Sequence, residues 1–176
     1  NQSSPDKGVG CIGLAATFSP SEPLERFGLR RILLPLDGSD CSKSAMRYAF
    51  AIARAYGSEV HVVYVVNEAV IWALEGQGRQ DEARETERGF EEEGEAILSD
   101  ASKVGSGLGV RVVAHIERGI PFNEIVRASR RIGADMIVMG TKGSHGSRSL
   151  LGSTAEGVIR YSGIPVLVVP CPRQRE

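Results

Sequence analysis

The sequence predicts a doubly wound α/β fold, in which a parallel sheet of five strands carries helices on both faces. Two patterns favour this class. Five short runs are apolar at nearly every position, which is typical of strands buried on both faces in a parallel sheet. Segments with helical spacing of apolar residues separate these runs. A length of 176 residues with 41% hydrophobic content fits one domain with a sizeable core.

Residues 31–57 predict a strand followed by a helix. The apolar run 32–36 indicates a buried strand, and Pro35 is tolerable there because it stands near the end of the strand. Ser39 or Asp40 can cap a helix that runs to about Tyr56, and Gly57 stops it.

Residues 60–104 predict a second strand, a loop and a long helix. The strand is expected at 60–66, and the loop after it includes Trp72 and a Gly-Gln-Gly stretch. The helix is expected from about Gln80 to Val104, and its inner stripe is Phe90, Ile97, Ala101 and Val104. Residues 79–95 hold eight acids and three arginines, which is most simply a solvated helix face.

The last third of the chain alternates strands and helices. Strands are expected at 110–116, 136–139 and 166–169. One helix is expected at Pro121–Ile132, where the proline suits the first turn, and a shorter one at Ser153–Tyr161. Residues 31–170 are therefore expected to form the domain, preceded by a loosely ordered extension at 1–30 and followed by a tail at 171–176.

Charge and cysteine usage limit the partners and the compartment. A net charge near −1 and a pI of about 6.4 give no bulk attraction to nucleic acid or to an anionic membrane. The apolar runs are too short to span a bilayer. Cys11, Cys41 and Cys171 are widely separated and form no CxxC or Cys/His pattern, so neither a disulfide framework nor a zinc site is expected. A reduced, cytoplasmic setting is the simplest expectation.

A glycine-rich loop follows the fourth expected strand. In a doubly wound sheet, ligands bind outside the carboxyl ends of the strands, so the loops at this edge are the ones to inspect. Residues 140–154 hold four glycines, four serines, two threonines, Lys142 and Arg148, and no acid. Glycines let backbone N–H groups approach an anion, and a helix start favours negative charge. The loop therefore predicts phosphate binding.

The same residues permit other interpretations. Ser153 with Glu156 three residues later can be a capping box, which needs no ligand. The loop is not a Walker A motif, and no GxGxxG follows the first strand. A receiver domain would need a phosphoacceptor aspartate ending the third strand, but the chain there reads His115-Ile116-Glu117.

The loop and the strands around it resemble the universal stress protein family. The family signature is glycine, two residues, glycine, nine residues, glycine, then serine or threonine. Here Gly140, Gly143, Gly152 and Ser153 match it, except that eight residues separate the second and third glycines. The first strand with Asp37 resembles the family's first strand and its acidic loop. The resemblance covers residues 31–170.

The resemblance implies a site as well as a fold. The family sheet has the order 3-2-1-4-5 and is of the adenine nucleotide alpha-hydrolase-like type, so the first and fourth strands are neighbours. Asp37 is then expected near the ribose. The alternative, which needs no ligand, is that Asp37 or Asp40 only caps the next helix. The residues expected to hold the nucleotide are Pro35, Leu36, Asp37, Val65, Met139, Gly140, Lys142, Gly143, Arg148, Gly152, Ser153 and Thr154.

The expected function is binding of ATP, or of AMP or ADP, with Mg²⁺ as a possible companion. Neither a catalytic base nor a triad is evident: His145 lies inside the loop, while His61 and His115 fall in strands and are more often structural. Slow hydrolysis stays open. The alternatives are a stress protein that works through protein contacts without a nucleotide, and a cyclic AMP binder. The last strand is apolar on both faces and would form an edge, so a homodimer through this strand is expected.

Overall fold

A five-stranded parallel sheet organises the molecule. The computed structural model describes residues 28–143 and 151–172. The strands are β1 (Arg31–Pro35), β2 (Glu59–Asn67), β3 (Val112–Gly119), β4 (Met136–Gly140) and β5 (Val166–Val169). They pair in parallel in the order β3-β2-β1-β4-β5. The predicted fold class and strand order are therefore confirmed, and the order reverses between β1 and β4.

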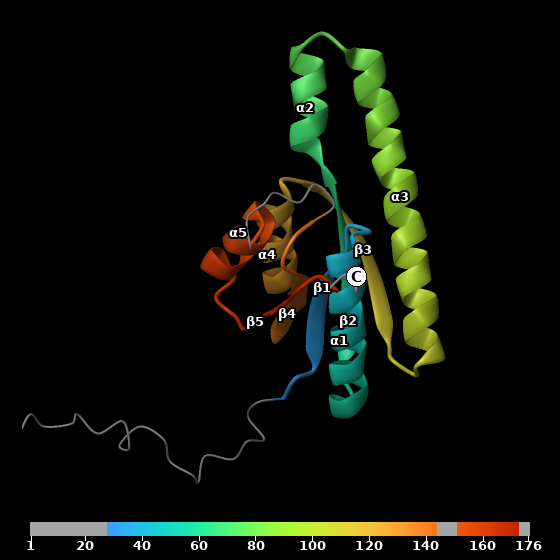
Figure 1. Ribbon diagram of the computed structural model, residues 1–176, viewed down its shortest axis with the longest axis vertical. Helices are drawn as coiled ribbons and strands as arrows, with labels where there is room; N and C mark the ends of the chain where they lie inside the picture. The colour runs from blue at the N-terminus through green and yellow to red at the C-terminus, as the bar shows by residue number, and fades with distance from the viewer. Residues whose placement is uncertain (1–27, 144–150, 173–176) are drawn as a thin grey trace, which may run out of the picture.

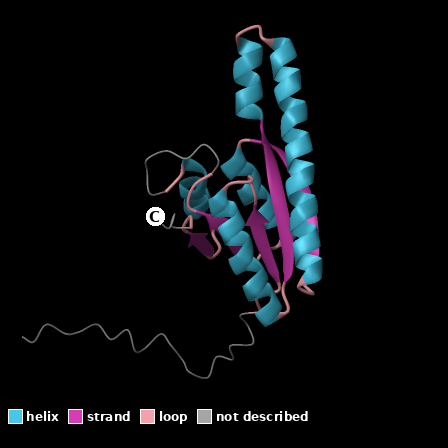
Figure 2. Ribbon diagram, turned by 45° about the vertical axis from the view of Figure 1, so that its right-hand side comes forward, coloured by secondary structure: helices cyan, strands magenta, loops and turns pink. Residues whose placement is uncertain are grey.

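Helices cover both faces of this sheet (Figures 1 and 2). On one face, helices α1 (Asp40–Tyr56) and α3 (Gln80–Gly107) pack over a core that includes Phe50 and Leu98. On the other face, α4 (Pro121–Ile132) and α5 (Ser153–Tyr161) pack over a core that includes Ile125 and Val158. Every side chain from Ile32 to Leu34 is fully buried, because β1 lies at the centre of the sheet and is covered on both faces.

The local signals around α1 act as the sequence predicts. Ser39 is the N-cap, and its hydroxyl oxygen accepts a hydrogen bond from the Ser42 N–H at 3.1 Å. Gly57 ends the helix with φ of 69°, a left-handed conformation that glycine adopts without a steric cost. Pro35 is the last residue of β1, so its missing N–H interrupts no central pairing.

The segment after β2 is a helix and not the predicted loop. Helix α2 (Glu68–Gly76) contains Trp72, and the side chain of its N-cap Asn67 accepts from the Ala69 N–H. Helix α2 and the first part of α3 project together beyond the carboxyl ends of the strands, and the rest of α3 runs back along the sheet (Figure 1). The Gly-Gln-Gly stretch was predicted to belong to the loop. Its first residue, Gly76, is instead the last residue of α2, and only Gln77 and Gly78 lie in the turn before α3.

The acidic face of α3 is mostly exposed, as the sequence predicts, and part of it forms ion pairs with β3. Arg118 on β3 forms ion pairs with Glu87 and Glu91 of α3 and with Glu68 of α2. The predicted inner stripe of α3 is only partly right, because Ala101 is buried while Val104 is 44% exposed. Strand β3 begins two residues later than expected and runs on to Gly119, so that Arg118 falls within the strand.

Two histidines predicted to be structural lie together on neighbouring strands. His61 Nδ1 and His115 Nε2 are 2.9 Å apart, and His61 Nε2 lies 2.6 Å from Glu59 Oε1. Burial lowers the pKa of His115 below its ordinary value, and the nearby charges of His61 and Arg131 lower it further against the opposing carboxylate of Glu117. Over the described ranges, no helix is both long and apolar enough to cross a bilayer.

Candidate functional site

A cavity of about 390 Å³ opens at the carboxyl ends of β1 and β4, where the strand order reverses. This volume lies within the usual range of small-molecule sites. Its walls come from the ends of β1, β2 and β4, from the loops after β1 and β4, and from the first turn of α5. Two segments that are about a hundred residues apart in sequence thus face each other across one cleft.

One side of the cavity is the loop between β1 and α1. The Asp37 carboxylate accepts hydrogen bonds from the Ser39 N–H at 3.1 Å and from the Ser39 hydroxyl at 2.6 Å. Ser39 in turn caps α1, so Asp37 fixes the orientation of the capping side chain. The capping residue is Ser39 and not Asp37 or Asp40, and Asp37 also lines the cavity.

The opposite side is the base of the glycine-rich loop. The Gly152 N–H donates to the Thr141 carbonyl oxygen at 2.8 Å, and the Thr141 N–H donates to the Val169 carbonyl oxygen at 2.9 Å. These bonds join the two ends of the loop to each other and its first end to β5. Lys142 and Gly143 follow Thr141 along the cavity wall.

Helix α5 begins at this wall without a side-chain cap. Gly152 is its N-cap, Ser153 is its first residue, and no side chain forms a capping hydrogen bond there. The capping box predicted as an alternative for Ser153 and Glu156 is therefore wrong: with Gly152 at the cap position, Ser153 already lies inside the helix. The first N–H groups of α5 consequently stand at the edge of the cavity.

The glycines of the loop differ in how much room the neighbouring atoms would leave for a side chain. A Cβ at Gly140 would lie 2.7 Å from the Cβ of Cys41, so the close packing of β4 on α1 requires glycine there. A Cβ at Gly143 would lie 2.6 Å from Asp37 Oδ2, so this glycine lets the two loops approach. A Cβ at Gly152 would meet its nearest atom, the Thr141 carbonyl oxygen, at 3.4 Å, which is an ordinary contact.

The walls of the cavity are partly apolar. Val63, Val65 and Met139 line it from the strands, Leu36 from the position after β1, and Ile125 from α4. Polar groups line it from the loops after β1 and β4 and from the first turn of α5, and Tyr64, Asn67 and Glu93 add others from β2 and α3. The cavity thus combines apolar and polar walls, which suits a ligand with one flat apolar part and one anionic part.

Every predicted site residue within the described ranges lines this single cavity. Those brought together are Pro35, Leu36, Asp37, Val65, Met139, Gly140, Lys142, Gly143, Gly152, Ser153 and Thr154. Arg148 lies outside the described residues.

Sequence reasoning did not select several other residues that line the cavity. They are Ser42, Val63, Tyr64, Asn67, Val70, Phe90, Glu93, Pro121, Ile125, Thr141 and Ala155. Thr141 stood in the recognised loop and could have been found from it. Phe90 and Glu93 could not, because they reach the site only through the packing of α3 on the sheet.

Tyr64 and Glu93 form a polar contact in the cavity wall. The Tyr64 hydroxyl donates to Glu93 Oε2 at 3.1 Å. Burial raises the pKa of Tyr64 above its ordinary value, and the negative charge of Glu93 raises it further. Tyr64 therefore stays a neutral donor across the physiological range. In the described ranges, no group of three or more His, Cys, Asp or Glu side chains is placed to hold a metal ion.

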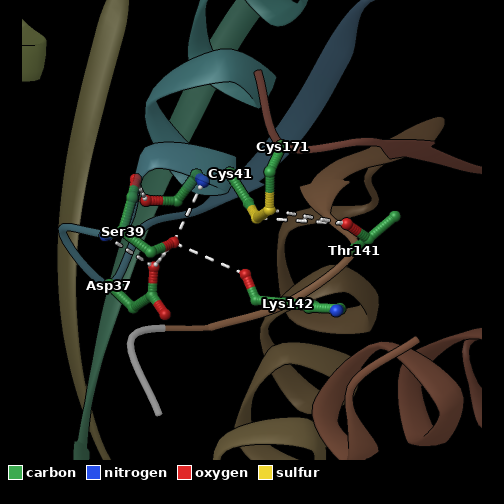
Figure 3. The surroundings of a disulfide bond; sticks show 7 residues. Asp37, Ser39, Cys41, Thr141, Lys142 and Cys171 are labelled. Carbon is green, nitrogen blue, oxygen red and sulfur yellow. Dashed lines mark hydrogen bonds between the residues drawn. A yellow bond between two sulfur atoms is a disulfide. The ribbon is translucent and has the colours of Figure 1, made fainter. Parts of the chain in front are cut away.

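A disulfide bond joins Cys41 at the start of α1 to Cys171 after β5 (Figure 3). The sequence had predicted no disulfide, and this is a correction. The two cysteines are 130 residues apart in the chain, and only the return of β5 to the side of β4 brings them together. The Thr141 hydroxyl lies 3.9 Å from the Cys41 sulfur and 4.0 Å from the Cys171 sulfur, so the bond stands directly behind the glycine-rich loop.

Comparisons with known proteins agree with this arrangement. The universal stress protein family matches residues 28–170. Universal stress protein MJ0531 of Methanocaldococcus jannaschii is 38% identical over 146 residues, which is 82% of this chain and 84% of that protein.

Solved structures give the same result. The structure of protein MJ0577 from the same archaeon has a TM-score of 0.72 at 31% identity and covers 85% of this chain and 99% of its own. A universal stress protein in complex with cAMP has a TM-score of 0.59 at 23% identity, covers 82% of this chain and 99% of its own, and shares the fold. The family match spans every strand and helix described above, and so this chain belongs to the universal stress protein family.

Proposed function

We propose that this chain binds an adenine nucleotide, with ATP as the first candidate, in the cavity between the ends of β1 and β4. The bound nucleotide would act as a regulatory ligand that changes how the protein contacts its partners in a stress response. The observation that carries the proposal is that the site residues predicted from the sequence, wherever the structure describes them, converge on one cavity. A structural neighbour crystallised with cAMP supports the class of ligand.

The two sides of the cavity would hold different parts of the nucleotide. The base would pack on the apolar walls near Leu36 and Val65, and the sugar hydroxyls would donate to the Asp37 carboxylate. The phosphates would lie at the start of α5, where backbone N–H groups and the helix dipole favour negative charge. Lys142 would add a charge-assisted contact, and Mg²⁺ could accompany the phosphates.

Gly152 supports the position of the phosphates. The packing on Cys41 requires glycine at Gly140, and a Cβ at Gly143 would displace the Asp37 carboxylate, whereas a Cβ at Gly152 would meet only ordinary contacts. Its φ of −81° is also accessible to any residue. Packing and backbone conformation therefore do not require glycine at this N-cap, which serine, threonine, asparagine or aspartate would also suit, and a residue without a Cβ leaves the backbone open to a phosphate.

Titration calorimetry with ATP, AMP and cyclic AMP tests the proposal. The Gly152→Val variant is expected to lose at least tenfold in ATP affinity because its side chain occupies the path of the phosphate. Gly107→Val is the matched control, since Gly107 is exposed at the far end of α3 and a Cβ there meets no atom within 4 Å. Equal ATP binding by the wild type and Gly152→Val would refute the site.

The ranking of the three nucleotides separates the remaining alternatives. Preference for cyclic AMP would make the chain a cyclic nucleotide binder. Binding of none of them would favour a stress protein that works through protein contacts alone. Slow ATP hydrolysis is compatible with the site, which is proposed as a binding site and not as a dedicated catalytic centre.

The proposed form of the protein is a cytoplasmic homodimer whose domain spans residues 31–170. Strand β5 is the last strand of the sheet next to β4, and three of its four residues are only partly buried. An apolar edge of this kind is suited to pairing with a second copy. Light scattering at micromolar concentration tests it: Val168→Lys should shift a dimer toward monomer, and a monomeric wild type would contradict the proposal.

A further inference from the structure

We propose that the Cys41–Cys171 pair is a thiol–disulfide switch that sets the affinity of the neighbouring nucleotide site. The inference rests on the proposed function for its readout in binding, but its structural part can be measured without a nucleotide. Two observations carry it: the position of the disulfide behind the glycine-rich loop, and the unequal exposure of its two cysteines.

The disulfide connects the two sides of the cavity. Cys41 is the second residue of α1, and the next residue, Ser42, lines the cavity. Cys171 follows β5, whose Val169 carbonyl oxygen accepts from the Thr141 N–H at the base of the glycine-rich loop. The bond therefore ties the start of α1, the end of β5 and the base of the loop into one unit (Figure 3).

The packing behind the loop leaves little room for a change at Cys41. A Cβ at Gly140 would lie 2.7 Å from the Cys41 Cβ and 2.8 Å from its carbonyl carbon. Gly140 and Thr141 are themselves part of the cavity wall. A shift of Cys41 when the bond opens is thus transmitted to residues that line the site.

The two sulfurs are not equivalent toward an external thiol. Cys41 is 3% exposed, whereas Cys171 is partly exposed in the segment after β5. A thiolate from a dithiol reductant would attack the Cys171 sulfur, which breaks the S–S bond and releases Cys41 as a thiolate. The N-terminus of α1 stabilises this leaving group.

The second thiol of the reductant then completes the exchange. It displaces Cys171 from the mixed disulfide, so the reductant becomes a disulfide and the protein gains two electrons and two protons. An oxidised dithiol runs the same steps in reverse. Cys41 and Cys171 are thus reduced and oxidised together, with the reductant as the balancing partner.

Reduction is expected to weaken nucleotide binding. The end of β5 is no longer tethered to α1, so the base of the loop loses a constraint that holds it in its binding geometry. Couplings between two sites are typically fivefold or more, and we expect a loss of about fivefold to tenfold in ATP affinity.

Calorimetry with ATP on the full chain, before and after treatment with dithiothreitol, measures the coupling. Cys171→Ser should bind as the reduced wild type does, and it should not respond to the reductant. Cys11→Ser is the matched control, because it removes a cysteine outside the pair and should still respond. By linkage, ATP must make the disulfide harder to reduce by the same factor, and tenfold corresponds to about 30 mV.

Hydrogen exchange of the Thr141 and Gly152 amides without nucleotide separates this inference from the proposed function. Faster exchange on reduction, in a protein that binds ATP in neither state, would support the structural coupling of the disulfide to the loop and refute both the nucleotide site and its control by the switch. Equal ATP affinity with unchanged exchange would overturn the switch and leave the nucleotide site intact. Free-thiol titration that finds Cys41 and Cys171 unpaired after air oxidation would also overturn it.

Discussion

Helices α1 and α5 begin at the same edge of the sheet, on opposite sides of one cavity, and their starts are built differently. The start of α1 is closed by its own side chains, because Ser39 caps it and Asp37 orients Ser39. The start of α5 has glycine at the cap position and no side-chain cap. Both starts carry the same backbone donors, so the side chains alone decide which of them can receive an anion.

The two sides of the cleft therefore have different roles. The α1 side is a rigid wall, fixed by capping, by the packing of Gly140 on Cys41 and by the disulfide. The α5 side keeps its donors facing the cavity, as a preorganised anion site requires. Substitutions on the α1 side should therefore act mainly on stability, and those on the α5 side mainly on ligand binding.

The largest effect is expected from opening the disulfide, which is a feature of the α1 side. The bond closes a loop across a sequence separation of 130 residues, and bonds of this kind typically contribute about 2–4 kcal/mol by restricting the unfolded chain. Reduction should lower the free energy of unfolding by that amount. Denaturant titration with and without dithiothreitol measures it, and no change in the midpoint would contradict the prediction.

The second prediction compares one substitution on the two sides. Gly140→Ala should cost about 1–3 kcal/mol, because its Cβ overlaps Cys41 and the packed strand has little room to move. Gly152→Ala should cost less, about 0.5–1 kcal/mol, because its Cβ meets only ordinary contacts and the cost is that of a poorer N-cap residue. Urea unfolding without nucleotide is the measurement. An equal cost at both positions would remove the distinction between the walls.

Removing the cap of α1 should have an intermediate effect. Ser39→Ala loses the acceptor for the Ser42 N–H, which typically costs about 1 kcal/mol. Ser39→Thr retains a hydroxyl and is the matched control. Thermal unfolding should place the threonine variant close to the wild type, and an alanine variant of unchanged stability would show that the cap contributes nothing.

The corresponding change at the start of α5 should scarcely affect stability. Ser153 forms no capping hydrogen bond, so Ser153→Ala should unfold within about 0.5 kcal/mol of the wild type. Its ATP affinity should nevertheless fall several-fold if the hydroxyl contacts a phosphate. Calorimetry and unfolding on the same variant decide between the two helix starts: lost stability with retained binding would reverse the assignment.

The smallest expected effect on the free energy of unfolding is that of acid, which acts through His115 and not through either helix start. The pKa of His115 is lowered in the folded protein, so the unfolded chain takes up this proton first as the pH drops below about 6.5. The free energy of unfolding should therefore decline between neutral pH and about pH 5. His115→Asn should reduce this decline, while the cost of Ser39→Ala should not change with pH.

The strands and most helices could be predicted because their signals are local. Val62 and Val138 belong to short apolar runs, and Gly57 and Pro121 stand where helices end and begin. Helix α2 is the exception, because Gly76 and Gly78 near its end favour a loop in this segment. Asn67, which caps α2, was the available signal.

The part of the cavity formed by loops that follow strands could be predicted, whereas the part formed by the α2–α3 hairpin could not. Asp37 and Gly152 stand in loops that follow strands, so the topology of a parallel sheet brings them together. Glu93 and Val70 line the same cavity from the α2–α3 hairpin, and nothing near them in the chain indicates it. The pairing of Cys41 with Cys171 depends likewise on where β5 ends.

By itself, the sequence determined the fold class, the order of elements and the polar loops at one edge of the sheet, because periodicity, glycines and caps act over a few residues. Only the tertiary structure decided three other features: that the α1 side of the cleft is closed by its own side chains, that packing does not require glycine at Gly152, and that Cys41 pairs with Cys171. These depend on contacts between residues about a hundred positions apart, and such contacts form only once the strands have found their neighbours.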